Sequence, residues 1–205
     1  MTREVVLVPG LWMPAGAMSL LAARLGRYGF EPRLFPLRGR EAMAENVERL
    51  SRFARERLAG RPAHFVGHSL GGVLILEALE RHRDIAVASV VLLGAPVRGS
   101  RVGRRFSRLG LGRWMMGAAG AHWAERAPRW GRPEPLGVVA GTLSLGLGRL
   151  LGNIEGVNDG VVGLEETPIE GMTAQAQVAV SHSMLIASGR VARMVRRFLA
   201  EGRLE

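Results

Sequence analysis

The sequence predicts an α/β protein in which a mostly parallel sheet of about six strands carries helices on both faces. Short runs rich in Val and Leu alternate with longer segments of helical period. The run 5–8 is continuously apolar, as is typical of a strand buried on both faces. The length of 205 residues suffices for one domain with a sizeable core, so we expect a single domain over residues 1–205.

The boundaries of the predicted elements follow from apolar periodicity and from Gly and Pro breaks. The predicted strands are 5–8, 33–37, 63–67, 87–93, 136–140 and 177–180, and the predicted helices are 15–28, 43–58, 70–81 and 184–200. The last helix places Leu185, Ala192, Val195 and Leu199 along one face. One link is notably short, because only His68 and Ser69 separate the third strand from its helix.

One connection departs from this alternation. Residues 97–135 contain three of the four Trp residues and many Arg residues, and a segment of this length between strands is usually a functional insertion. Its apolar and Arg residues alternate, which allows contact with an anionic membrane; a helical cap packed on the sheet is the other interpretation. Residues 141–152 are predicted to form a Gly-rich, flexible loop.

Composition excludes several chemistries. The chain has no Cys and no Lys, which excludes disulfides, thiolate zinc sites, a Cys nucleophile, lysine Schiff bases and lysine-containing phosphate loops. The net charge of +10 favours anionic partners without choosing among them. The initial apolar run is too short for a signal peptide, and no stretch is suited to span a membrane, so we expect a soluble, cytoplasmic protein with peripheral membrane contact as an extension.

The residues Gly67-His68-Ser69-Leu70-Gly71 fit the pattern G-x-S-x-G between a strand and a helix. Such a sharp turn holds a serine in strained backbone geometry and lifts its hydroxyl toward open space. Small residues on either side avoid collision with the strand and helix. Ser69 is therefore the candidate nucleophile. The alternative is a Gly-rich turn with an incidental serine.

A serine nucleophile needs a histidine base and a carboxylate that orients it. His182 directly follows the last predicted strand, whereas His122 lies in the Arg-rich insertion, where we expect a surface or lid residue. Asp159 lies between the fifth and sixth strands, although its Asn-Asp-Gly context is also typical of a turn. The only other aspartate, Asp84, precedes the fourth strand, which leaves Glu155 and Glu165 as the alternative acids.

Attack on a carbonyl also needs hydrogen-bond donors for the negative charge that develops on oxygen. The amide of Leu70, next to Ser69, is one candidate donor. The loop after the first strand supplies the second, with the Leu11 amide preferred and the Trp12 amide as the alternative. Trp12 and Met13 are candidates for lining the acyl-binding site, and core packing explains both equally well.

Taken in order, these motifs resemble the α/β-hydrolase superfamily, in particular its small bacterial lipase- and esterase-like members. The resemblance rests on the G-H-S-x-G-G turn, the N-D-G-V-V loop and the S-H loop. It implies Ser69 as nucleophile, Asp159 as acid, His182 as base and the Leu11 and Leu70 amides as an oxyanion hole. It also implies a sheet lacking the first two strands of the full fold. The expected reaction through these three side chains needs no metal and no organic cofactor.

The sequence departs from the family pattern where many relatives have His-Gly and this chain has Pro9-Gly10. We expect a serine hydrolase that acts on carboxylic esters with an apolar acyl group. A thioesterase or amidase would use the same residues, and a non-catalytic membrane-docking module of this fold is the rival from another class. The expected partners are a small or lipid ester and an anionic membrane contacted through residues 97–135. Nucleic acid is not expected, because aromatic residues are few; the oligomeric state stays open.

Overall fold

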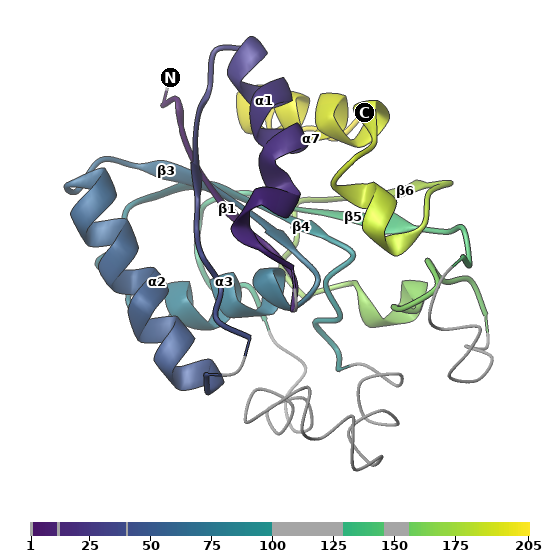
Figure 1. The fold of residues 1–205 in the computed structure, drawn as a ribbon, viewed down its shortest axis with the longest axis horizontal. Coiled ribbons are helices and arrows are strands. Elements are labelled where there is room, and N and C mark those ends of the chain that lie inside the picture. Colours follow the sequence, from purple (N-terminus) through teal and green to yellow (C-terminus); the bar gives the residue numbers. More distant parts are fainter. Residues whose placement is uncertain (1, 12, 40, 100–128, 146–155) are drawn as a thin grey trace.

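The protein is built on one sheet of six parallel strands, which confirms the predicted architecture (Figure 1). The computed structural model describes residues 2–11, 13–39, 41–99, 129–145 and 156–205. The order across the sheet is β2-β1-β3-β4-β5-β6, and every neighbouring pair is parallel. The strands are β1 (Glu4–Val8), β2 (Glu31–Leu34), β3 (Ala63–His68), β4 (Val87–Leu93), β5 (Leu136–Gly141) and β6 (Ala174–Val178).

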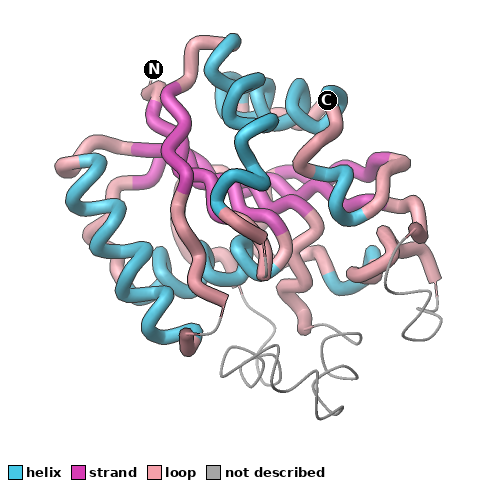
Figure 2. Tube along the Cα trace, viewed as in Figure 1, coloured by secondary structure: helices cyan, strands magenta, loops and turns pink. Residues whose placement is uncertain are grey.

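Two pairs of helices cover the two faces of the sheet (Figure 2). Helices α1 (Ser19–Arg27) and α7 (Gly189–Glu201) pack on one face, and α2 (Met43–Leu58) and α3 (Leu70–Arg81) pack on the other. Each pair encloses its own apolar cluster. Along β1, Val5 and Leu7 belong to the α1–α7 cluster and Val6 and Val8 to the α2–α3 cluster, as the two-residue period of a strand requires. Burial on both faces explains why β1 is apolar throughout.

Two strand predictions were displaced. The sixth strand runs over Ala174–Val178 and not over 177–180, because β5 pairs with it from Gly137↔Ala174 to Gly141↔Val178. This edge strand alternates exposed Gln with buried Ala176 and Val178, so its pattern is weaker than that of a central strand. The second strand covers Glu31–Leu34 and not 33–37, and Pro36, which has no N–H to donate, follows it.

Two helix predictions were too long. Residues 15–28 divide into a 3-10 helix, η1 (Ala15–Met18), and α1. The predicted helix 184–200 is a short 3-10 helix, η4 (His182–Leu185), followed by α7. The side chain of Ser188 caps α7, because its Oγ accepts a hydrogen bond from the Val191 N–H at 3.4 Å. Leu185, Ala192, Val195 and Leu199 are all buried, as the apolar period predicted.

The described end of the insertion is anchored to the protein body. Trp130 is buried in the α2–α3 cluster, and its indole N–H donates to the Glu134 carbonyl at 2.6 Å. The guanidinium of Arg132 donates to the carbonyls of Leu79 and Ile85 at 3.0 and 2.9 Å. Most of the predicted insertion, with His122, and part of the predicted Gly-rich loop lie outside the described residues. Within the described ranges, no helix is both long and apolar enough to cross a bilayer.

Candidate active site

Ser69 occupies the turn between β3 and α3 at the carboxyl edge of the sheet. Its backbone angles are φ 54° and ψ −126°, a left-handed φ that side chains other than glycine rarely adopt. The Ser69 N–H donates to the Leu93 carbonyl of β4 at 2.9 Å, which holds the strained turn against the neighbouring strand. The side chain is partly exposed, unlike those of His68 and Leu70 on either side. The turn therefore presents its one hydroxyl outward.

The glycines of the motif are required by close backbone contacts. A methyl group on Gly67 would lie 2.5 Å from the Gly72 Cα, and one on Gly71 would lie 2.4 Å from the carbonyl oxygens of Val8 and Pro9. Both distances are shorter than any carbon side chain tolerates. The motif therefore has glycine at the positions where the backbones of β1, β3 and α3 are in contact.

Asp159 is held by its own loop. It is 1% exposed, and its Oδ1 accepts hydrogen bonds from the backbone N–H groups of Val161 at 3.0 Å and Val162 at 2.8 Å. Its backbone N–H donates to the Val162 carbonyl at 3.1 Å, which closes the turn. Two backbone donors fix one carboxylate oxygen and leave Oδ2 free to face another residue.

His182 is that residue. Its Nδ1–H donates to Asp159 Oδ2 at 2.8 Å, and its backbone N–H donates to the Asp159 carbonyl at 2.8 Å. Because a carboxylate accepts and does not donate, the Nδ1 nitrogen carries the proton and Nε2 is left as an acceptor. His182 as a whole is 8% exposed and Asp159 is 1% exposed, so the pair is largely shielded from water. This is the arrangement that a general base requires.

Two contacts place the Asp159–His182 pair beside the turn that bears Ser69. The first runs through β4, where the Leu93 carbonyl accepts the Ser69 N–H and Gly94 follows Leu93. A methyl group on Gly94 would lie 3.0 Å from Asp159 Oδ2 and 3.3 Å from His182 Nδ1. The ring of His68, the residue before Ser69, lies 4.6 Å from the His182 ring between centroids. Three segments far apart in sequence therefore meet at one edge of the sheet.

His68 links these segments and was not singled out from the sequence. Its Nε2–H donates to the His182 carbonyl at 3.0 Å, and its Nδ1 has no hydrogen-bond partner among the described residues. A methyl group on Gly10 would lie 3.1 Å from that Nδ1 atom. Burial lowers the pKa of His68 to about 3, with a smaller contribution from His182. A neutral ring here avoids a second positive charge beside His182 when that imidazole is protonated.

The loop after β1 lies against the Ser69 side chain. A methyl group on Gly10 would lie 3.1 Å from the Ser69 Cβ, so the loop that carries Leu11 adjoins this residue. The Leu70 amide is in the first turn of α3, where N–H groups have no acceptor within the helix. Met13 is partly buried against the α1–α7 cluster, which places it with the core. Trp12 lies outside the described residues.

The competing residues are engaged elsewhere or are not described. Asp84 pairs with Arg55 at 2.8 Å, on the α2–α3 side. Glu165 is exposed in the 3-10 helix η3 (Leu164–Glu166), and Glu155 is outside the described residues. Gly94, with φ +55°, is a site residue that the sequence indicated only as the end of a strand. Over the described ranges, no group of three or more His, Cys, Asp or Glu side chains is placed to hold a metal ion.

The model of the alpha/beta hydrolase family matches residues 5–200, almost the whole chain. The chain belongs to the alpha/beta hydrolase family. No curated protein sequence matches this alpha/beta hydrolase.

Solved structures share the hydrolase's fold at low sequence identity. The mature lipase BlEst2 of Bacillus licheniformis is 21% identical with a TM-score of 0.77, over 97% of this chain and 91% of that chain. The metagenomic carboxyl esterase MGS0156 is 21% identical with a TM-score of 0.68, over 97% and 76%. A thermophilic esterase from Thermogutta terrifontis is 16% identical with a TM-score of 0.69, over 99% and 91%.

The motif glycines give a stability prediction. Replacing Gly71 with alanine should lower the free energy of unfolding by at least about 3 kcal/mol, because the methyl group overlaps the β1 backbone. The matched control is Gly26→Ala in α1, where a methyl group meets nothing within 4 Å. That variant should gain about 0.5–1 kcal/mol of helix propensity. Urea unfolding measures both, and equal effects from the two substitutions would contradict the packing described here.

Two buried histidines predict how stability depends on pH. Burial lowers the pKa of His64 to about 4 and that of His68 to about 3, from 6.5. As the pH falls, the unfolded chain takes up these protons before the folded protein does. The two histidines therefore leave the free energy of unfolding at its full value above pH 6.5 and lower it as the pH falls toward 4 to 3. Between pH 7.5 and pH 5 each histidine should cost about 2 kcal/mol of unfolding free energy.

Urea unfolding at a series of pH values measures this dependence. The variant His64→Asn, which removes one of the two groups, should lower the slope between pH 7 and pH 5 by about half. A stability that stays constant or rises as pH falls through this window would contradict the assignment of two neutral, buried imidazoles.

Proposed function

We propose that this protein is a serine hydrolase that cleaves carboxylic esters with an apolar acyl group. The observation that carries the proposal is the hydrogen bond between Asp159 Oδ2 and His182 Nδ1 beside the strained turn of Ser69. A carboxylate, an imidazole with a free Nε2 and a serine at a nucleophile elbow are the groups that acyl transfer needs. The similarity in fold to structures named as lipase and esterase supports the same reaction class.

The first half of the reaction forms an acyl-enzyme. The Ser69 Oγ attacks the ester carbonyl while His182 Nε2 takes the hydroxyl proton. Negative charge moves to the carbonyl oxygen, where the amides of Leu70 and Leu11 are the proposed donors. Asp159 keeps the Nδ1 proton in place and stabilises the imidazolium. The tetrahedral intermediate then expels the alcohol, which takes the proton from Nε2.

The second half releases the acid. A water molecule gives a proton to His182 Nε2 and attacks the acyl carbonyl, and negative charge develops again on the carbonyl oxygen. The intermediate collapses, the carboxylic acid leaves, and Ser69 regains its proton from the imidazole. Apart from the ester and one water molecule, these steps use only side chains and amides of this chain.

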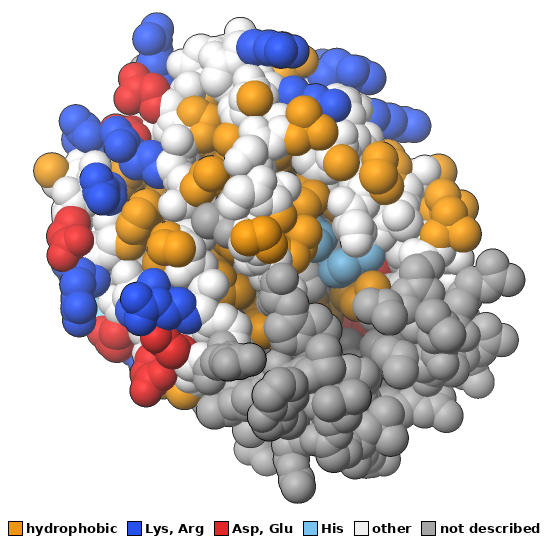
Figure 3. All heavy atoms as spheres, viewed as in Figure 1, with side chains coloured by type: hydrophobic (Ala, Val, Ile, Leu, Met, Phe, Trp, Pro, Cys, Tyr) orange, Lys and Arg blue, Asp and Glu red, His pale blue; other side chains and the backbone are white. Residues whose placement is uncertain are grey.

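Exposed apolar side chains border the pair and support an apolar substrate. Met184 belongs to the same 3-10 helix as His182 and is 48% exposed. Leu143 and Leu145 follow β5 and are 43% and 51% exposed. A methyl group on Gly160, next to Asp159, would lie 2.3 Å from the Leu145 carbonyl oxygen, so this segment packs on the acid loop. Apolar side chains also adjoin the exposed histidine surface in Figure 3.

Hydrolysis of p-nitrophenyl esters of increasing chain length tests the proposal. Ser69→Ala and His182→Ala should each lower kcat by at least about a thousandfold with little change in melting temperature. The matched controls are Ser183→Ala, at an exposed serine beside His182, and His82→Ala, at a histidine bonded to Glu48 on the α2–α3 side. Both should hydrolyse at the wild-type rate. Wild-type turnover by His182→Ala would remove this histidine as the base.

Asp159→Asn tests the orienting carboxylate. The amide leaves a donor or a weaker acceptor facing Nδ1, so the tautomer with a free Nε2 is no longer favoured. We expect slight residual activity, between that of wild type and that of His182→Ala. Comparing kcat/KM for matched esters, thioesters and amides then identifies the preferred bond. A higher value for the thioester or amide would replace the ester assignment while keeping the same three residues.

A further inference from the structure

The two faces of the sheet carry different charge. Helices α1 and α7 together contain six Arg and one Glu, a formal balance of +5. Helices α2 and α3 contain five Arg and five Glu, a balance of zero. Figure 3 shows the same difference: Arg side chains gather over α1 and α7 at the top, and blue and red alternate over α2. The excess positive charge of the described helices therefore lies on one side.

Two of the four α7 arginines form no ion pair among the described residues and the other two share one carboxylate, whereas three of the five arginines of α2 and α3 each pair with a separate carboxylate. Arg190 and Arg193 are exposed and form no ion pair within the described part of the chain. Arg196 and Arg197 reach only Glu201, at 4.0 and 3.3 Å. That single carboxylate also pairs with Arg203 at 3.0 Å. Most of the positive charge on α7 is therefore available to an anionic ligand.

The position of Arg190 is unfavourable for the helix itself. It lies in the first turn of α7, where the helix dipole favours acidic side chains, and that turn contains none. An arginine here lowers helix stability by a few tenths of a kcal/mol unless an anion faces it. Arg190 is therefore better explained by the binding of an anion than by the stability of α7.

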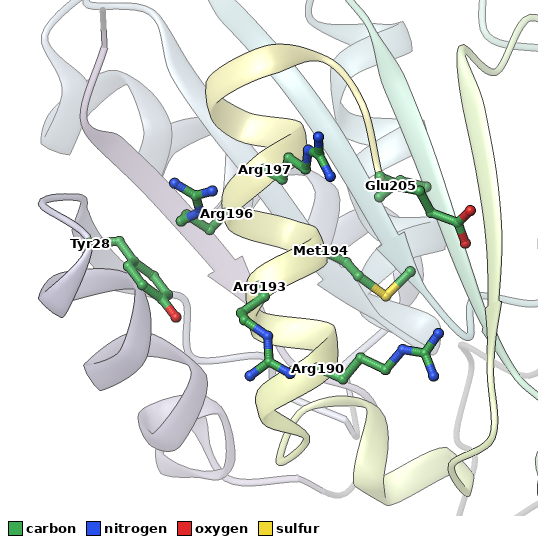
Figure 4. Close-up of a pocket in the computed structure, with 8 residues that line it drawn as sticks. Tyr28, Arg190, Arg193, Met194, Arg196, Arg197 and Glu205 are labelled. Atoms are coloured by element: carbon green, nitrogen blue, oxygen red, sulfur yellow. The ribbon is translucent and has the colours of Figure 1, made fainter.

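The arginine side chains spread over the surface and do not converge on a point (Figure 4). Arg196 extends toward α1, where its guanidinium lies 5.6 Å from the centre of the Tyr28 ring, and Arg190 extends on the other side of α7. Together with Arg193 and Arg197 they line an open groove of about 620 Å³. A spread of charge fits an extended array of phosphates better than one small anion.

We propose that the α1–α7 face is a docking surface for an anionic phospholipid bilayer. Exposed apolar side chains accompany the arginines: Leu20 on α1 is 47% exposed, and Tyr28 at its end is 46% exposed. Arginines beside such side chains contact lipid phosphates while the apolar groups enter the interface. Single-stranded nucleic acid is disfavoured, because stacking of bases needs several exposed aromatic rings. Within the described ranges, Tyr28 is the only Phe, Tyr or Trp residue that is exposed.

Docking of this face would bring the site to the membrane. Helix α7 directly follows η4, which carries His182 and the exposed Met184. The surface differs from the insertion 97–135, most of which lies outside the described residues. The inference goes beyond the proposed hydrolysis and uses none of the residues assigned to it.

Co-sedimentation with vesicles tests the proposal. The protein is mixed with vesicles of phosphatidylcholine alone or of equal parts phosphatidylcholine and phosphatidylglycerol, in the Ser69→Ala background so that lipid is not consumed. We expect binding only to the anionic vesicles, and release as salt is raised. Arg190→Glu/Arg193→Glu should weaken binding at least roughly tenfold.

The matched control is Arg52→Glu/Arg57→Glu, which makes the same change in net charge at two exposed arginines of α2. It should bind like wild type. Arg190→Glu places an acid at the start of α7, where it favours the helix, so unfolding does not explain a loss. In the Ser69 enzyme, Arg190→Glu/Arg193→Glu should hydrolyse a short soluble ester at the wild-type rate. If no ester is cleaved by any variant, the proposed function fails and the vesicle result still stands.

Any of the following results would overturn the docking surface. The first is an equal loss of binding in the two double variants, which would make total charge the cause. The second is wild-type binding by Arg190→Glu/Arg193→Glu, or no binding of wild type to anionic vesicles. The third is tighter binding to short duplex DNA than to vesicles at equal accessible phosphate, which would identify nucleic acid as the partner.

Discussion

The hydrogen bond between Asp159 and His182 is the constraint on which the site depends. It joins two loops, each from a different part of the sheet edge, and the second bond, from the His182 amide to the Asp159 carbonyl, fixes their relative position. Because Oδ1 is already occupied by the amides of Val161 and Val162, only Oδ2 faces the imidazole. One bond therefore sets both the tautomer and the direction of the free Nε2.

Close backbone packing holds the strained Ser69 turn beside this pair. Gly67, Gly71 and Gly72 let β3, α3 and β1 approach within distances that side chains would prevent, and Gly94 leaves room for the carboxylate and the ring. The strain at Ser69 is balanced by burial of the surrounding strands on both faces. The packing of the apolar core therefore also positions the residues of the candidate site. The arginine-rich face of α7 is solvent-exposed and does not contribute to the core.

Much of the fold follows from the sequence, and the reasons differ by element. Helices α2 and α3 and strand β4 begin and end where predicted, because their apolar period is strong and their ends are marked. Strand β6 and the start of α7 were wrong, because an edge strand has a weak pattern and the Ser188 cap acts locally. Asp159 was selected by chain order and the scarcity of Asp, but the linking roles of His68 and Gly94 depend on contacts between distant segments, which no local pattern encodes.

We propose that Ser69, His182 and Asp159 act together on a bound carbonyl. A fluorophosphonate probe tests it most directly, because the probe bonds only to an activated serine and the modified peptide is identified by mass spectrometry. We expect one adduct per chain, on Ser69, formed rapidly in wild type and at least about a thousandfold more slowly in His182→Ala. An adduct on another residue, or labelling of Ser69 at the same rate without the imidazole, would contradict it.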